Sequence, residues 1–247
     1  MFLVLCSSND YAARWAFEGL GQLGVAPLEL ITSEDLAYSR FWEHRVGTAS
    51  TSVRLSLPNG RAICSSRVAG VLNRLLSAPQ ELVNHARPND RDYASQELSS
   101  FYLSWLRALP GIVINRPTPQ GFCGRWRHTS EWALLAQQAG LPAPPFRQTV
   151  QHEPEHGFRS LAPRGAPVES VIVLHGKVFG PALPEDTLLA CRRFAALAES
   201  ELLGIDLFRT NDGRWNFATA TPYPELTRGG QPLLSHLAQV FTQGEKQ

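Results

Sequence analysis

The chain has 247 residues, of which 43% are hydrophobic and 18% charged, and its formal net charge is +1. This length allows one large domain or two small ones with a sizeable core, and the balanced charge excludes a general attraction to nucleic acid or to a membrane surface. No apolar run approaches the length that a membrane span needs.

The N-terminal half predicts alternating strands and helices. Residues 2–6 (FLVLC) indicate a buried strand rather than a signal peptide, because no basic segment precedes them. The opening order of strand, helix and strand is typical of a doubly wound α/β domain. We expect a helix at 11–23, a strand at 28–31, a hairpin with strands at 53–57 and 61–64, a strand at 68–72, a helix at 92–109 and a strand at 112–114.

The C-terminal half contains a long stretch without a clear period, residues 142–167, which is rich in proline, glycine and histidine. We expect residues 152–167 to be exposed and mobile. Around this stretch, the predicted elements are a helix containing Trp132 and Ala136, a hairpin at 170–174 and 178–179, a helix from 184 to about 203, a hairpin at 205–208 and 215–218, and a helix at 232–241.

The four cysteines are widely spaced and form no CxxC pair; they are Cys6, Cys64, Cys123 and Cys191. Scattered single cysteines in a chain of this size usually are buried, reduced thiols. The sequence therefore predicts a cytoplasmic protein without disulfides. The histidines show no metal-ligand spacing, and the chain has no nucleophile elbow, Walker loop or GxGxxG motif.

Three stretches follow one another in an order that resembles one enzyme family. They are Gly60–Arg74 with the following segments 92–105 and 113–117 (VINRP), Trp132–Pro142 (WALLAQQAGLP), and Leu203–Pro224. Together they resemble the ATP-grasp carboxylate–amine ligases, particularly the glutamate-ligase-like branch that includes peptide macrocycle ligases. The resemblance covers most of the chain.

The resemblance implies an α/β, ATP-grasp-like fold made of two domains. Residues 1–117 would form a doubly wound N-terminal domain, and residues 118–247 a truncated grasp domain. In the second domain, a loop at 150–167 would stand in place of the lid subdomain.

Ligases of this family phosphorylate a carboxylate with ATP and let an amine attack the acyl phosphate, which requires lysines and Mg²⁺ held by hard oxygen ligands. This chain departs from that pattern. Thr129 stands at the place of the first lysine, and Thr219 and Thr221 stand where the family has Glu and Asn. Asp206 is kept, either as a weak metal ligand or as the cap of a turn.

Lysine is scarce: of the 23 lysine and arginine residues, two are lysines, Lys177 and Lys246. Arginine does not replace lysine where a compact, strongly hydrated charge is needed. The bias reflects either the composition of the genome or a phosphate site that has been given up. Lys177 lies in a predicted hairpin turn, where a solvated lysine is the ordinary finding.

Arg74 and Arg116 each follow a predicted strand of one sheet, at the edge where ligands collect in open α/β folds. An anion-binding cleft is therefore predicted at this edge, lined by four arginines: Arg74, Arg116, Arg125 and Arg127. The alternative is that Arg74 and Arg116 pair internally with Asp92 or Glu97 and hold the long helix in place.

These observations favour a pseudoenzyme of a biosynthetic gene cluster, with no catalytic residue and no cofactor. It would bind an acidic peptide, a small carboxylate or a partner enzyme in the former substrate cleft. The alternative is an active ATP-dependent carboxylate–amine ligase that uses Mg-ATP and grips phosphate with arginines; a third reading is an unrelated α/β protein. No nucleic acid or membrane partner is expected. The sequence leaves undecided whether the protein forms a homodimer.

Overall fold

The computed structural model describes residues 1–81, 83–145 and 160–244. The chain forms two compact units, the first from Met1–Arg125 with Leu234–Gln247 and the second from Trp126–Leu233. Most of the predicted loop 150–167 lies outside the described residues. The first unit extends past residue 117 because Phe122 joins its core and accepts a hydrogen bond, through its carbonyl oxygen, from the side chain of Asn73.

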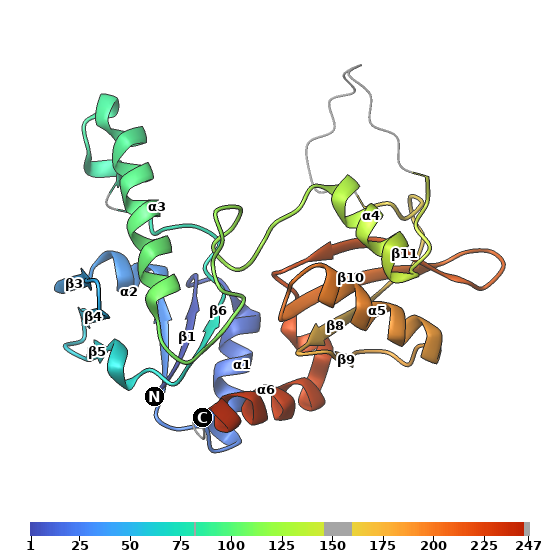
Figure 1. Ribbon diagram of the computed structural model, residues 1–247, viewed down its shortest axis with the longest axis horizontal. Helices are drawn as coiled ribbons and strands as arrows, with labels where there is room; N and C mark the ends of the chain where they lie inside the picture. Colours follow the sequence, from blue (N-terminus) through green and yellow to red (C-terminus); the bar gives the residue numbers. More distant parts are fainter. Residues whose placement is uncertain (82, 146–159, 245–247) are drawn as a thin grey trace. The chain divides into compact units, whose positions relative to one another are not determined.

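The first unit is centred on a parallel sheet in the order β2-β1-β6-β7 (Figure 1). Its strands are β1 (Phe2–Cys6), β2 (Leu28–Thr32), β6 (Gly70–Asn73) and β7 (Ile112–Ile114). Its helices are α1 (Tyr11–Gln22), α2 (Ser33–Ala37) and α3 (Arg91–Ala108), with short 3-10 helices at Ser65–Arg67, Val83–His85 and Pro88–Asp90. The strands and long helices expected for this half are confirmed.

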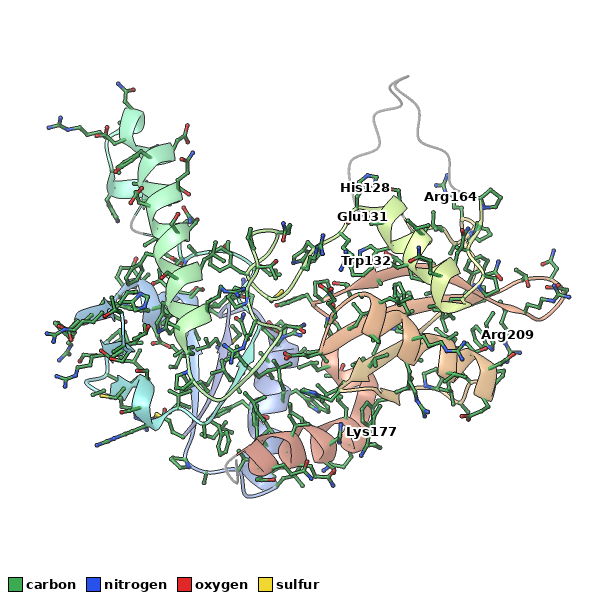
Figure 2. All side chains as sticks on the ribbon, in the orientation of Figure 1. His128, Glu131, Trp132, Arg164, Lys177 and Arg209 are labelled. Carbon is green, nitrogen blue, oxygen red and sulfur yellow. The ribbon has the colours of Figure 1, made fainter. Side chains whose placement is uncertain are left out.

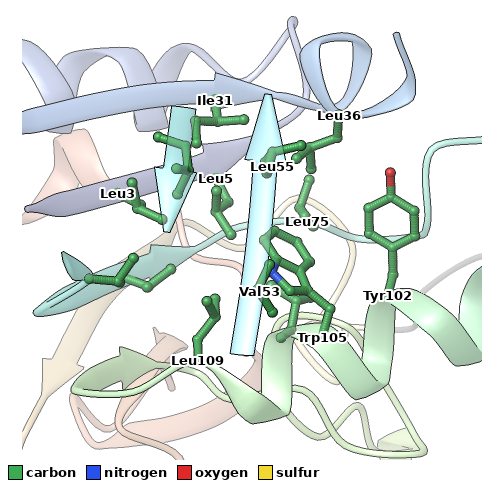
Figure 3. Packing of buried hydrophobic residues seen from close by; sticks show 14 of the residues in the cluster. Leu3, Leu5, Ile31, Leu36, Val53, Leu55, Leu75, Tyr102, Trp105 and Leu109 are labelled. Carbon is green, nitrogen blue, oxygen red and sulfur yellow. The ribbon is translucent and has the colours of Figure 1, made fainter. Parts of the chain in front are cut away.

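Alternate residues of β1 pack on opposite faces of this sheet. Leu3 and Leu5 join a core with Trp105 of α3 (Figure 3). On the other face, the ring of Phe2 stacks on that of Phe241 with centroids 5.1 Å apart. Because both faces are covered, β1 is apolar at every position instead of alternating.

A second sheet of the first unit is antiparallel and has the order β3-β4-β5. Its strands are β3 (Phe41–Val46), β4 (Thr51–Ser56) and β5 (Ala62–Cys64). The hairpin of β4 and β5 was predicted, whereas β3 was missed. Trp42 holds β3 in place, because its ring packs edge-to-face against Trp105, Tyr102 and Phe101 of α3, at 4.8 Å for Trp105.

The second unit has an antiparallel sheet in the order β11-β10-β8-β9, packed against two helices (Figure 1). Trp132, Phe194 and Phe217 interlock edge-to-face between sheet and helices, with ring centroids 5.7 and 5.3 Å apart. The strands are β8 (Val168–Leu174), β9 (Lys177–Phe179), β10 (Leu202–Arg209) and β11 (Trp215–Thr221), and the helices are α4 (Thr129–Ala139) and α5 (Glu185–Leu197), followed by the 3-10 helix η4 (Leu226–Gly229).

The predicted end of helix α5, at about residue 203, was wrong. The helix ends at Leu197, and Glu199 has φ +53°, a left-handed conformation that stops the helix. Leu202 and Leu203 then open β10. Their apolar side chains suit a buried strand as well as a helix, so periodicity alone did not place the boundary.

The last helix, α6 (Gly230–Gly244), was assigned from the sequence to the C-terminal domain, but from Leu234 onward it belongs to the first unit. Leu234 lies against Gly19 of α1, where a Cβ atom would come within 2.4 Å of its Cδ1. Phe241 packs on Phe2 and Gly70. The first unit therefore takes part of its core from the end of the chain.

Within the described residues, no helix is long and apolar enough to cross a membrane. The four cysteines are free thiols, with Cys6, Cys123 and Cys191 buried and Cys64 half-buried. Burial raises the pKa of Cys6 and of Cys191 to about 12. Their thiolate fractions at neutral pH are therefore negligible.

Cys64 is expected to react first with a thiol reagent such as iodoacetamide under native conditions, because the other three thiols are buried. Mass spectrometry of the labelled protein measures the order of reaction. Cys64→Ser should abolish the fast labelling phase. Labelling of Cys6 or Cys191 at the rate of Cys64 without denaturant would contradict the burial of these thiols.

Candidate functional site

The carboxyl edge of the parallel sheet, where the sequence placed an anion-binding cleft, contains a buried ion pair. Arg74 follows β6, and its Nε and Nη2 donate to the two carboxylate oxygens of Asp10 at 2.6 and 3.2 Å. Both side chains are 3% exposed. Asp10 also accepts the Ala13 amide at 2.9 Å and so caps α1. Arg74 therefore has an internal carboxylate partner, which is neither Asp92 nor Glu97.

Arg116 follows β7 and contacts backbone carbonyl groups. Its Nη2 donates to the carbonyl oxygen of Gly111 at 2.8 Å, and its Nη1 to that of Leu109 at 3.2 Å. The acceptors lie in the turn between α3 and β7, where helix carbonyls have lost their intrahelical partners. This contact holds the end of α3 on the sheet, and the long helix is thus fixed through its C-terminus.

Arg127 acts in the second unit. Its guanidinium lies over the ring of Trp132, 5.6 Å from the centroid, and its Nη2 donates to the carbonyl oxygen of Ala198 at 3.0 Å. It therefore joins the start of α4 to the end of α5. Arg125 is half-buried and ends the N-terminal segment of the first unit. The predicted ligand-binding role of the four arginines stays a prediction, and Arg74, Arg116 and Arg127 have the internal partners described above.

The retained carboxylate, Asp206, lies on the face of the β8–β11 sheet opposite the helices. Its neighbours in β10, Ile205 and Leu207, point into the core with α4 and α5, so the alternation of the strand turns Asp206 the other way. Across the sheet, Asp206 pairs with Ser170 of β8 and with Thr219 of β11. The residues facing it on both neighbouring strands therefore carry hydroxyl groups.

A chain of hydrogen bonds leads from Asp206 to an arginine. The hydroxyl of Ser170 donates to Oδ1 of Asp206, and Nη1 of Arg228 donates to the Ser170 oxygen at 2.9 Å. These groups line a cleft of about 150 Å³ in the second unit, together with Thr221 and Glu225. We call this the Asp206 cleft.

Sequence reasoning found Asp206 but missed Ser170, Glu225 and Arg228. Ser170 is 36 residues away and becomes its neighbour through the register of β8 on β10. Glu225 precedes the 3-10 helix η4 and caps it by accepting from the backbone amide of Thr227 at 3.5 Å, while Arg228 lies within η4. The hydroxyl of Thr227 also donates to Glu225, at 2.9 Å. The charged residues that follow Pro224 were the signal in the sequence that could have pointed to this cleft. The orientation of their side chains depends on η4, which the sequence did not predict.

Asp206 and Glu225 both line the Asp206 cleft, but two features of the cleft weigh against a site for Mg²⁺. The hydroxyl of Thr221 accepts the amide of Tyr223 at 3.1 Å, and threonine oxygens are weak, neutral ligands beside carboxylates. Arg228 already brings a positive charge, which opposes a divalent cation. Across the described parts of the chain, no three His, Cys, Asp or Glu side chains gather in a way that could hold a metal ion.

Thr129, which stands at the place of the first ligase lysine, and Lys177 do not lie close together. Thr129 is the first residue of α4, where His128 provides the cap by accepting the Ser130 amide. Lys177 opens β9 and is exposed. Figure 2 shows Lys177 well apart from His128 and Glu131 within this unit.

No model of a known protein family and no curated protein sequence matches this chain. Solved structures do match it. The macrocyclase MdnC from Microcystis aeruginosa MRC, bound with the precursor peptide MdnA, has a TM-score of 0.74 at 12% identity, over 98% of this chain and 99% of that one. The Chryseobacterium gregarium RiPP-associated ATP-grasp ligase, in complex with ADP and a leader and core peptide, gives 0.73 at 9% identity, over 98% and 96%.

A third match is the ATP-grasp ligase PsnB, complexed with minimal precursor, Mg and ADP. Its TM-score is 0.71 at 17% identity, over 100% of this chain and 98% of that one. The chain therefore has the fold of the ATP-grasp ligases, which confirms the fold expected from the resemblance.

Proposed function

We propose that this protein is a non-catalytic ATP-grasp-like protein that binds a peptide. The observation that carries the non-catalytic part is the chain from Arg228 through Ser170 to Asp206. It puts a guanidinium one hydroxyl group away from the carboxylate that the resemblance assigns to the metal. The guanidinium of Arg228 therefore neutralises part of the negative charge of Asp206. Unlike a magnesium ion that enters and leaves with a nucleotide, this positive charge is a permanent part of the protein.

The peptide part of the proposal rests on the fold. Two of the solved proteins with this fold were crystallised with precursor peptides, or with leader and core peptides. The acidic character suggested by the sequence rested on Arg74 and Arg116, whose guanidinium groups have internal partners. We therefore propose that the bound peptide need not be acidic. If the peptide is a segment of an enzyme, the protein would bind that enzyme as its partner.

The alternative is an active carboxylate–amine ligase with an arginine-based phosphate grip. The contacts of Arg74, Arg116 and Arg127 weigh against it, because binding ATP phosphates would require these groups to leave carboxylate, carbonyl and indole partners. Magnesium-dependent nucleotide binding separates the two readings.

Isothermal titration calorimetry with Mg·ATP is expected to show no magnesium-dependent binding to the wild-type protein. Arg228→Met removes the cation but keeps most of the side-chain length, and it should increase the affinity for Mn²⁺, measured by electron paramagnetic resonance. Asp206→Asn in the Arg228→Met background should remove that gain. Binding of Mg·ATP to wild type that is lost in Asp206→Ala would establish the ligase alternative instead.

Peptide binding is tested separately with a displayed library of random peptides panned against the immobilised protein. We expect enrichment of a common motif that persists without ATP and Mg²⁺. No enrichment over the bare matrix would refute peptide binding without affecting the nucleotide result.

A further inference from the structure

Strand β3 is an edge of the small antiparallel sheet. Among the described strands it pairs with β4 alone, and it lies at the rim of its unit (Figure 1). An open edge presents unpaired backbone N–H and C=O groups to any strand that can align with them. At the end of β3, Val46 is 71% exposed.

The faces of β3 are defined by its register on β4. Trp42 and His44 stand opposite Leu55 and Val53, which are core residues, so they occupy the core face. Glu43 and Arg45 therefore occupy the outer face. They form an ion pair at 2.8 Å along the strand.

A second strand that extends this sheet must turn its own core-facing side chains to the same side of the sheet as those of β3. Few registers satisfy this condition. For two antiparallel copies of β3 related by a two-fold axis, the axis must pass through a residue, because residues on opposite faces do not pair. An axis at Glu43 would place two carboxylates opposite each other, and an axis at Arg45 would place two guanidinium groups together.

The axis at His44 is the charge-complementary choice. It puts Glu43 of each copy opposite Arg45 of the other, so two ion pairs form on the outer face. It also puts Trp42 opposite the exposed Val46 of the second copy, and Phe41 opposite Gly47, the residue that follows β3. Both the polar and the apolar side chains of this strand are thus self-complementary.

We propose that two copies of this chain pair through β3, antiparallel about His44, and so form one continuous six-stranded sheet. The arrangement is isologous, since the same strand serves both copies. It does not depend on the proposed function, because all its residues lie in the first unit.

Charge reversal tests the proposed dimer by sedimentation equilibrium. Glu43→Arg and Arg45→Glu each place like charges opposite one another at two positions, and each should raise the dimer dissociation constant by about tenfold or more. When the two variants are mixed, every cross-strand pair becomes opposite in charge. The mixture should therefore form a heterodimer at least as tight as the wild-type dimer.

Arg61→Glu, which breaks the ion pair with Glu29 elsewhere in this unit, is the matched control and should leave dimerisation unchanged. Arg45→Glu faces Ser52 within its own sheet, so the fold should tolerate it. A monomeric wild type would overturn the proposal and leave the edge protected by its charges or open to another protein's strand. A dimer insensitive to both reversals, or no heterodimer on mixing, would overturn it too.

Discussion

Arg74→Ala is expected to lower the free energy of unfolding by about 3–5 kcal/mol. The substitution removes the partner of Asp10 but leaves the carboxylate buried, with its side chain 3% exposed. A buried charge without its partner costs more than the ion pair itself contributes. Asp10 also holds the first turn of α1 through the Ala13 amide, so the loss should spread to that helix.

Urea denaturation followed by circular dichroism measures this effect. Arg61→Ala, which removes a surface ion pair with Glu29, is the control and should cost less than about 1 kcal/mol. The double variant Asp10→Leu with Arg74→Met should recover much of the loss, because it leaves no unpaired charge. Wild-type stability of Arg74→Ala would return this arginine to the candidates for ligand binding.

Phe241→Ala is expected to destabilise the first unit by about 3–5 kcal/mol, the usual cost of truncating a buried phenylalanine. The side chain is 0% exposed, and its ring stacks on Phe2 and fills the space above Gly70. A cavity would therefore open between the end of α6 and the parallel sheet, although residue 241 lies far from the N-terminal strands in sequence.

The measurement is again equilibrium unfolding in urea, with hydrogen exchange of the β1 amides as a local probe. Gln239→Ala changes an exposed residue of the same helix and should stay within about 0.5 kcal/mol of wild type. Equal stability of the two variants would mean that α6 is not a structural part of the first unit.

Much of the candidate site could not be predicted from the sequence, because its residues, like Phe241 and Phe2, are far apart in the chain and meet only in the folded protein. Asp206 was found because it lies in a stretch that resembles the ATP-grasp ligases. Ser170 and Arg228 complete its hydrogen-bond chain from other strands and turns. Arg74 was found as a strand-end residue, but its partner Asp10 is 64 positions away, and no spacing rule connects them.

The sequence by itself determined most of the elements and, through its resemblance to the ATP-grasp ligases, the fold class. Apolar runs such as FLVLC, helical spacing in the long helix now seen as α3, and glycine and asparagine turns are local signals, since each is a periodicity or residue preference that is read from neighbouring positions. The tertiary structure alone decided that β3 forms on the aromatic face of α3, that α6 completes the N-terminal core, and that arginines expected to face a ligand contact Asp10 and the carbonyl of Gly111. These outcomes depend on which residues far apart in the sequence come into contact. The residues next to an arginine or an aromatic residue are the same whether its side chain faces a ligand, a carboxylate or another ring, so they do not reveal its partner.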